Sequence, residues 1–437
     1  MEDHAERIVK EATKQGAQDA VAEVVVDRNH QIRFAQNQPV IVNRWRKQIA
    51  SVFLAHDKRV VVGEITNFAK IPVTIAKLIK VAKASQPNPE FVGIAKGPFN
   101  YGRAAVDPGI LALEGGGDYV QAAIDGALEE GAKETAGSFW RYDEEHFLNT
   151  SNGVSAQDRR VGLYLSIRAL VSLESSGHGV SCATKVSQFH PESAGHKAGR
   201  IAALAKKPRG GTPGKYDIVF DPLIFGSLID QVGNRASAYA VAAGLSPYGD
   251  KLGKPVASPV VTLYDDGSAD TLGRRRFDQE GVPTKKTAIV QKGVLKTYLH
   301  NTSTAKKFKT RTTANAGLIS PEPHALGAAP GDWTRDELFR EVKDGLWLTN
   351  TWYTRYQSYV TGDFSTIPRD GIFRIRKGEI AEAWKDIRLT DNLINVWKSV
   401  KALSKTREQV TWWGEVSVAT MAPYALAQQI GITKSAM

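Results

Sequence analysis

The histidines and the single cysteine are the residues best suited to metal or nucleophilic chemistry, and their spacing limits what they can do. The chain has nine His and one Cys, Cys182. Two imidazoles one helical turn apart can share a tetrahedral zinc ion, as in HExxH, but no pair of His has this spacing. His190 and His196 are six residues apart, and we expect both on the surface; we also expect His300 and His324 to face solvent. The pattern predicts no self-contained zinc site.

Two shorter patterns could support nucleophilic catalysis. His178 precedes Cys182 by four residues and could act as its base, which would make the chain a stand-alone peptidase. Ser303 and Lys306 match SxxK, but the companion SDN and KTG elements are missing. We expect Cys182 to be a buried or incidental thiol and keep the stand-alone peptidase as an alternative.

Tryptophan gathers near the C-terminal end. Seven of the nine Trp lie in the last 105 residues. Packing in the core of a curved sheet would account for them, and so would an apolar, aromatic groove for an extended peptide or a partner subunit. The two interpretations remain open at this stage. The seven are Trp333, Trp347, Trp352, Trp384, Trp397, Trp412 and Trp413.

Length and composition define the class of protein. The 437 residues are 42% hydrophobic and 24% charged, which is typical of a soluble globular chain of two or three domains. No stretch reaches the roughly 20 apolar residues of a membrane span, and the first residues are polar. We therefore expect a cytoplasmic protein with no signal peptide and no membrane partner.

The net charge of +11 is concentrated in the middle of the chain. Residues 201–320 contain 18 Lys and Arg against 9 Asp and Glu. The densest part, 274–311, could attract acidic peptide segments or, in an alternative reading, nucleic acid. Because a charge run is usually a solvated surface, we expect nucleic-acid binding to be weak and non-specific at most.

The elements predict an α+β fold with two domains. We expect an N-terminal α/β domain over 1–205, with strand pairs near 19–66 that turn at 27–30 and 56–58, and helices that begin at Pro72 and Pro191. A Pro- and Gly-rich linker follows at 206–216. The C-terminal domain, 217–437, is expected to have a large antiparallel sheet and one long helix near 222–243.

Several motifs then resemble a known family. LGKPVASPVVTLYDDG and the residues that follow it to 299, NAG at 315–317, DGLWLTN at 344–350, VTGDFS at 360–365 and KGEIAE at 377–382 resemble the TldD/PmbA family, also described as modulators of DNA gyrase. Residues 151–171 resemble the end of its N-terminal domain. The resemblance implies a pair of branches: a TldD branch with HExxGH that holds zinc, and a PmbA or TldE branch that lacks it and assembles with the first.

Counting back from Gly253 without gaps places HExxGH on residues 229–234. Ile229 then stands at the first ligand position, Asp230 at the base position and Asn234 at the second ligand position. Isoleucine has no lone pair for a metal, and a neutral amide oxygen suits a zinc site built from imidazole and thiolate poorly. By resemblance, this chain is a PmbA-like, non-catalytic subunit without a cofactor of its own.

The same resemblance implies the partner, the cofactor and the substrate. We expect zinc in a TldD-like catalytic subunit, with this chain forming a heterodimer or higher complex with it, or a homodimer when alone. Substrates would be unfolded peptides that enter as extended strands and gain main-chain hydrogen bonds. The residues we expect to touch them are Trp352, Tyr353, Asp363 and Phe364.

Overall fold

A long curved sheet forms the N-terminal half of the molecule. The computed structural model describes residues 2–102 and 106–435. The six strands follow the order β3-β2-β1-β4-β5-β6, and every pairing is antiparallel. The bounds are β1 Asp19–Ala35, β2 Gln38–His56, β3 Arg59–Ile65, β4 Glu134–Thr150, β5 Ser155–Ser172 and β6 Ser175–Ala183.

The first strand is longer than the sequence predicted. We expected a turn at 27–30, but β1 runs through it and the chain reverses at Gln36 and Asn37, which have positive φ values of 52° and 62°. Two successive positive φ values produce the tight turn that matches strand twist, and Asn tolerates them. The turn expected at 56–58 is confirmed, with positive φ at Asp57 and Lys58.

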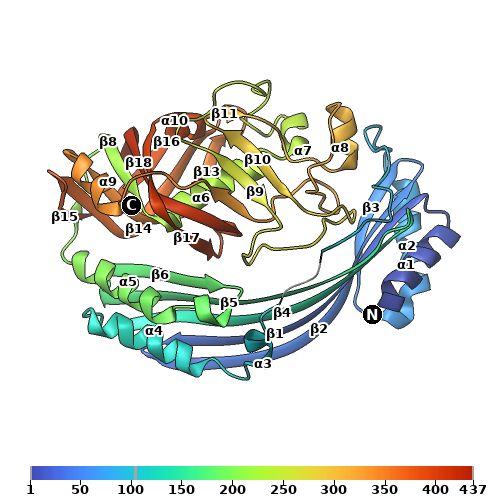
Figure 1. Ribbon diagram of the computed structural model, residues 1–437, viewed down its shortest axis with the longest axis horizontal. Helices are drawn as coiled ribbons and strands as arrows, with labels where there is room; N and C mark the ends of the chain where they lie inside the picture. Colours follow the sequence, from blue (N-terminus) through green and yellow to red (C-terminus); the bar gives the residue numbers. More distant parts are fainter. Residues whose placement is uncertain (1, 103–105, 436–437) are drawn as a thin grey trace.

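Helices cover the outer face of this sheet at both ends (Figure 1). The expected helices at Pro72 and Pro191 are confirmed, with proline in the first turn of each. Gly195 lets two helices touch, because a Cβ there would lie 2.0 Å from the Ala123 carbonyl oxygen. The helices are α1 Glu2–Lys14, α2 Ile71–Ala84, α3 Pro108–Ala112, α4 Gly117–Glu129 and α5 Pro191–Leu204.

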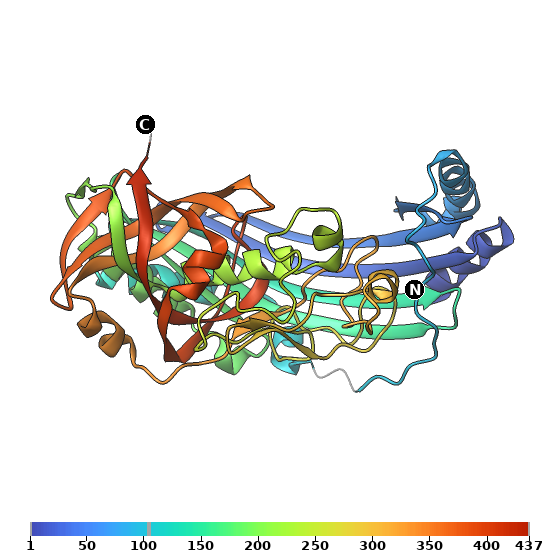
Figure 2. The ribbon, with the colours of Figure 1, turned by 90° about the horizontal axis from the view of Figure 1, so that it is seen from above.

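The C-terminal half contains a 12-stranded sheet that lies over the inner face of the first (Figures 1 and 2). The expected large, mostly antiparallel sheet is confirmed: most of its strand pairs are antiparallel, and three pairs, β12 with β18, β13 with β8 and β15 with β7, are parallel. Both halves together form the α+β fold that the sequence predicted, although the N-terminal sheet is antiparallel and not of the α/β type.

Five strands of the mixed sheet close on themselves. β18 pairs with β8, β8 with β13, β13 with β14, β14 with β16, and β16 returns to β18. The strands are β7 Arg209–Gly210, β8 Gly214–Phe220, β9 Leu263–Asp266, β10 Lys286–Gln291, β11 Val294–Leu295, β12 Leu326–Ala328, β13 Asp344–Ser358, β14 Asp363–Arg376, β15 Glu379–Lys385, β16 Ile387–Asn392, β17 Val400–Trp412 and β18 Val416–Lys434.

The single long helix expected near 222–243 is two helices. α6 covers Pro222–Arg235 and α7 covers Ala238–Ala242. Between them Ser237 has ψ 124°, its hydroxyl donates to the Pro321 carbonyl, and its backbone bridges Leu299. Bonding to Leu299 replaces the helical bonds, so the helix ends there. The other helices are α8 Thr302–Lys307, α9 Arg335–Glu341 and α10 Leu393–Lys398.

The segment expected as a linker, 206–216, contains strand structure. β7 pairs with β15 through Arg209 and Trp384, and β8 begins at Gly214. Backbone groups that have no partner in a free linker are bonded here to β15. This segment is therefore part of the strand structure of the C-terminal half and not a free connection between the halves.

A buried carboxylate joins the two sheets. Asp370 on β14 accepts hydrogen bonds from Arg168 on β5 (2.7 Å), Ser176 on β6 (2.8 Å) and Asn350 on β13 (3.1 Å). Burial alone would raise the pKa of Asp370, but the charge of Arg168 holds it below its usual range. The sheets are therefore held together by an ionised and fully hydrogen-bonded group.

His178 extends this junction as a neutral imidazole. The Asn350 amide nitrogen donates to its Nδ1 (2.9 Å), so Nδ1 is unprotonated and Nε2 shares a hydrogen bond with the Ser166 hydroxyl (2.8 Å). Burial, assisted by the charge of Arg168, lowers the pKa of His178 to about 3. The folded protein thus excludes a proton that His178 accepts when the chain unfolds.

Two further histidines differ from expectation. His300 and His324 were expected to face solvent, but both are 2% exposed. His324 Nε2 lies 3.0 Å from the Ala314 carbonyl oxygen, and His300 packs between Tyr298 and Phe308. Burial lowers the pKa of His300 to about 4 and that of His324 as well. Long loops that fold back on the sheet bury these rings, and the sequence carries no periodicity that reveals this.

We predict that acid destabilises the protein through His178. Its folded pKa of about 3 lies below the ordinary 6.5, so its stabilising contribution is complete above pH 6.5 and is lost as the pH falls toward 3. Between pH 6.5 and 4.5 this amounts to about 2 kcal/mol. In His178→Gln the free energy of unfolding, from urea titrations, should fall less over this interval. His190→Gln, at an exposed site, is the control, and equal slopes in wild type and His178→Gln would contradict the prediction.

Candidate functional site

The three positions aligned with a zinc motif lie on α6 and form part of the packing. Ile229 is 1% exposed and belongs to the main hydrophobic core. Asp230 Oδ1 accepts hydrogen bonds from the Ser417 hydroxyl (2.9 Å) and the Val418 amide (3.1 Å). Asp230 Oδ2 accepts one from the Asn234 amide nitrogen (2.8 Å). The helix is thereby attached to the start of β18.

These side chains do not fit a zinc ion. Ile229 offers no donor, and both oxygens of Asp230 already hold protein hydrogen bonds. Asn234 directs its amide nitrogen, which cannot bind a cation, toward Asp230. Burial raises the pKa of Asp230 to about 6. Among residues 2–102 and 106–435, no three His, Cys, Asp or Glu side chains gather as a metal site would require.

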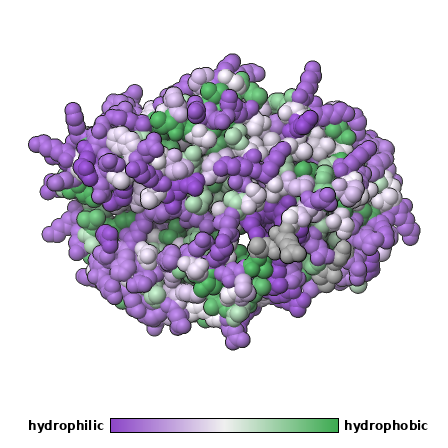
Figure 3. All heavy atoms as spheres, in the orientation of Figure 1, coloured by the Kyte–Doolittle hydropathy of each residue, from purple (hydrophilic) through white to green (hydrophobic). Residues whose placement is uncertain are grey.

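A hollow of about 700 Å³ lies next to this helix, between the two halves. Ser417, which bonds to Asp230, lines it, as does the hairpin turn that joins β17 to β18. Figure 3 shows that hydrophilic side chains cover most of this face of the molecule, with smaller apolar areas among them. The lining residues come from β1, β4 and β5 on one side and from the end of β17 and the start of β18 on the other. We call this hollow the aromatic cleft.

Aromatic rings cover both walls of the aromatic cleft. On the sheet, Trp140 stacks on Tyr142 with ring centroids 5.7 Å apart and meets Trp45 edge-on at 5.5 Å. Opposite them Trp412 lines the cleft and Trp413 projects with 79% of its surface exposed. Large rings beside polar groups such as Ser166 and Gln31 can hold an extended chain without selecting one side chain.

Two of the four residues expected to contact substrate lie near this cleft. Trp352 meets Trp412 edge-on at 6.3 Å and stacks on Tyr353 at 4.9 Å, and Arg369 lies 4.1 Å above the Trp352 ring. Tyr353 is half exposed. The Glu415 carboxylate accepts the Tyr353 amide hydrogen at 2.6 Å, which attaches β13 to the hairpin turn.

The other two residues lie further along the β13–β14 hairpin and support the fold. Phe364 is 1% exposed and packs in the core near Tyr356. Asp363 accepts hydrogen bonds from Thr361 (2.5 Å) and Asn392 (2.9 Å), and these lower its pKa. The VTGDFS motif therefore shapes the hairpin end, where Asn392 also caps α10.

Sequence reasoning did not single out the sheet wall of the cleft. Trp45 lies on β2, whereas Trp140 and Tyr142 lie on β4, and only the register of the sheet brings the two strands' rings to one face. The sequence did carry one signal for this surface, the adjacent Trp412 and Trp413 immediately before Gly414. Gly414 indicates a turn, and a turn leaves at least one of two adjacent rings outside the core. Trp347, Trp384 and Trp397 are core residues, as the packing interpretation predicts, whereas a groove for a peptide or partner subunit stays a prediction.

The nucleophile patterns are not assembled for catalysis. Cys182 is buried and burial raises its pKa to about 12, while both ring nitrogens of His178 bond to Ser166 and Asn350. The Ser303 hydroxyl donates to the Gly93 carbonyl (3.3 Å), and Lys306 is exposed on α8. His190 is exposed and His196 half-buried, as expected.

Several charged side chains of the basic region 274–311 make contacts within the protein. Arg276 donates to the Gln157 carbonyl (2.7 Å), Lys285 to that of Thr312 (3.2 Å), and Lys307 pairs with Glu90. Burial lowers the pKa of Arg275 to about 10. The charges thus serve several separate contacts. Within the described parts of the chain, no helix is long and apolar enough to cross a membrane.

Solved structures share this fold along nearly the whole chain. The structure of TldE from Thermococcus kodakarensis superposes with a TM-score of 0.84 at 18% identity and covers 98% of this chain and 100% of that one. A structure from Thermotoga maritima, described as a modulator of a DNA gyrase, has a TM-score of 0.84 at 21% identity, with coverages of 99% and 100%. These likenesses establish the fold.

The sequence itself identifies the family. Residues 213–434 match the family model described as the PmbA/TldA metallopeptidase C-terminal domain, which is half of the chain. The chain therefore belongs to the PmbA/TldD metallopeptidase family.

The curated relatives are similar over part of their length. A metalloprotease from Methanocaldococcus jannaschii is 33% identical over 206 residues, which are 45% of this chain and 44% of the relative. A metalloprotease from Methanothermobacter thermautotrophicus is 30% identical over 273 residues, 58% of each chain. The chain thus matches about half the length of these relatives.

We predict that Asp230 makes stability fall as the pH rises. Its folded pKa of about 6 exceeds the ordinary 3.8, so the folded chain keeps a proton that the unfolded chain has released, and ionisation above pH 4 costs stability. Asp230→Asn lacks this cost. The stability of the variant relative to wild type, from urea titrations, should rise by about 2 kcal/mol between pH 4 and 7. Asp336→Asn, at an exposed site, should show no such trend, and a flat difference for Asp230→Asn would refute the assignment.

Proposed function

We propose that this chain is a non-catalytic subunit of a TldD/TldE-like cytoplasmic metalloprotease complex. One observation carries the proposal: where a zinc peptidase of this family would place its two histidines, this chain has a core isoleucine and an asparagine bonded to Asp230. A chain that lacks electron-pair donors there cannot activate water on a metal of its own. Zinc would be held by a TldD-like partner.

Membership of the family supports the peptidase context. Relatives that match this chain are named metalloproteases, and the TldE structure shares its fold. A chain with this fold and without the metal donors is best explained as the member of a pair that completes the assembly. It would form a heterodimer or a higher complex with the catalytic subunit. A homodimer is the state expected when that subunit is absent.

The aromatic cleft supports a role in binding unfolded, extended peptides. It lies beside α6, between two sheets, and its rings offer apolar contact that does not depend on one side chain. We retain Trp352 and Tyr353 as candidate substrate contacts and add Trp412 and Trp413. Phe364 has no exposed surface for a ligand, and Asp363 serves the hairpin end.

The cytoplasmic location is part of the proposal, since a single cysteine is usual for proteins kept in a reducing compartment. Nucleic-acid binding is not favoured, because no observation on the basic region points to it.

We predict that peptidase activity requires the partner. The chain expressed alone should release no fragments from an unstructured peptide and should contain less than stoichiometric zinc by elemental analysis. Co-expressed with a TldD-like chain, it should co-purify as a stable complex that contains zinc and cleaves the peptide. Light scattering on the isolated chain would separate monomer from homodimer. Cleavage together with stoichiometric zinc in the isolated chain would overturn the proposal.

We predict that Trp413 contributes to peptide affinity. Because its side chain is 79% exposed, Trp413→Ala should fold normally yet weaken binding of a labelled unstructured peptide about fivefold, a loss of about 1 kcal/mol. Fluorescence anisotropy on the complex would measure this. Leu173→Ala removes an apolar side chain that is 97% exposed in the β5–β6 turn and is the matched control. Equal losses in the two variants would remove the cleft from peptide binding.

A further inference from the structure

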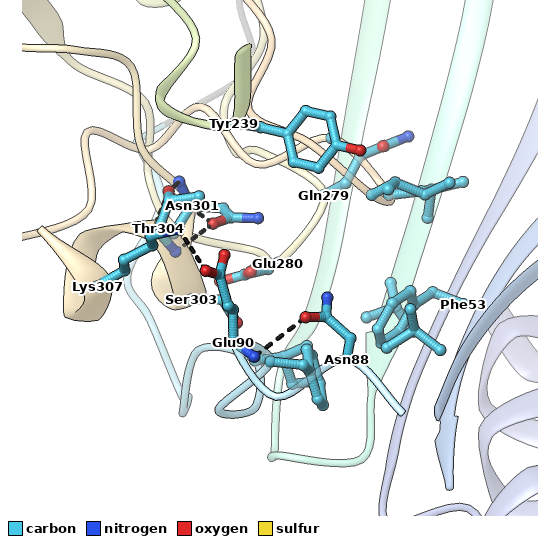
Figure 4. A pocket seen from close by; sticks show the side chains of 17 residues that line it. Phe53, Asn88, Glu90, Tyr239, Gln279, Glu280, Asn301, Ser303, Thr304 and Lys307 are labelled. Carbon is cyan, nitrogen blue, oxygen red and sulfur yellow. Dashed lines mark hydrogen bonds and ion pairs between the residues drawn. The ribbon is translucent and has the colours of Figure 1, made fainter. Parts of the chain in front are cut away.

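A second hollow lies between the two halves, near α7 and α8. Its volume is about 320 Å³. Val21 and Phe53 on the long sheet, Phe91 and Leu318 form apolar walls. Figure 4 shows Glu280, Asn301, Thr304 and Lys307 on one side of the hollow and Phe53 on the other. We call it the Glu280 pocket.

Glu280 is the buried polar group of this pocket. It is 7% exposed. Its Oε2 accepts hydrogen bonds from the Ala95 amide (3.2 Å), the Thr302 amide (3.3 Å) and the Thr302 hydroxyl. Its Oε1 has no hydrogen-bond partner among the described residues. One oxygen is thus fixed by three donors, and the other is left available on a lining residue.

The charge around Glu280 favours a cation. Asp278 lies behind it and is also buried, with hydrogen bonds from the Ala316 and Val282 amides (both 2.9 Å). Burial and the neighbouring Asp278 raise the pKa of Glu280 to about 8. Lys307, the cationic side chain in the lining, pairs with Glu90, another lining residue. With this pKa the Glu280 carboxyl is largely protonated near pH 7 while the pocket is empty. A bound cation would favour its ionised form, because Glu280 has no salt-bridge partner among the described residues.

We propose that the Glu280 pocket binds a primary ammonium group attached to a compact apolar body. The ammonium donates to Glu280 Oε1, and the apolar body packs on Val21, Phe53 and Phe91. Such a ligand supplies the donor that Oε1 lacks and buries the aromatic wall at the same time. This site lies apart from the aromatic cleft, and the inference does not depend on the proposed subunit role.

Two sources share this chemistry: the amino terminus of a peptide whose first residue is apolar, and a lysine side chain with its methylene stem. Calorimetry on the full chain at pH 7.5 would use phenethylamine as the general probe and N-acetylphenethylamine as its uncharged counterpart. Phenylalanine amide and Nα-acetyl-lysine amide then distinguish the sources. We expect phenethylamine to bind at least tenfold more tightly than the acetylated compound. No binding of any amine, or equal binding of the acetylated compound, would overturn the proposal.

Glu280→Gln keeps an oxygen that can accept the three hydrogen bonds and removes the charge. It should weaken binding of phenethylamine at least tenfold, whereas Glu341→Gln on the exposed face of α9 should not. Should Glu280→Gln fail to fold, Ile319→Trp provides the second test, because Ile319 lines the pocket with 59% of its surface exposed and a larger ring there narrows the entrance. Undiminished binding in a folded variant of either kind would refute the site.

Discussion

The carboxylate of Asp370 is the contact on which the arrangement of the two sheets depends. It is fully buried, yet it is ionised because Arg168, Ser176 and Asn350 reach it from three other strands. A buried charge that loses one such partner is strongly destabilising, so the geometry of these four strands is tightly specified. The sheets meet at the β5–β6 side through this group. Apolar clusters join the halves as well: Ile201 belongs to one core with Trp347 and Phe373, and Phe277 belongs to another with Val21 and Phe53.

Helix α6 illustrates how positions aligned with a metal motif can serve packing and hydrogen bonding instead. Eleven of its fourteen residues are buried, so nearly every side chain on it must pack or bond. Ile229 packs, and Asp230 and Asn234 bond to each other and to the start of β18. In a relative with a metal, the same positions would point donors at the ion. Here they attach α6 to Ser417, which lines the aromatic cleft.

Several features of the fold follow from local sequence alone. The turn at Asp57 and Lys58 and the helix starts at Pro72 and Pro191 rest on short-range conformational preferences, which act wherever the chain goes. Other features depend on another part of the chain and do not follow from local sequence. Ser237, where the helix breaks, bridges to Leu299, the buried ring of His300 packs against Phe308, and Arg209 in the strand 209–210 pairs with Trp384.

The same distinction between local sequence and tertiary structure applies to the candidate site. The sequence by itself determined the family resemblance and the chemistry that residues 229–234 cannot perform, because a side chain's donors are fixed by its type. Only the tertiary structure decided which aromatic residues share a surface. Trp140 and Trp412 are far apart in the chain and meet across one cleft because sheet register and the Asp370 junction place them there. It also decided that Asp363 and Phe364 support a hairpin, since burial is a property of the folded chain and not of a motif.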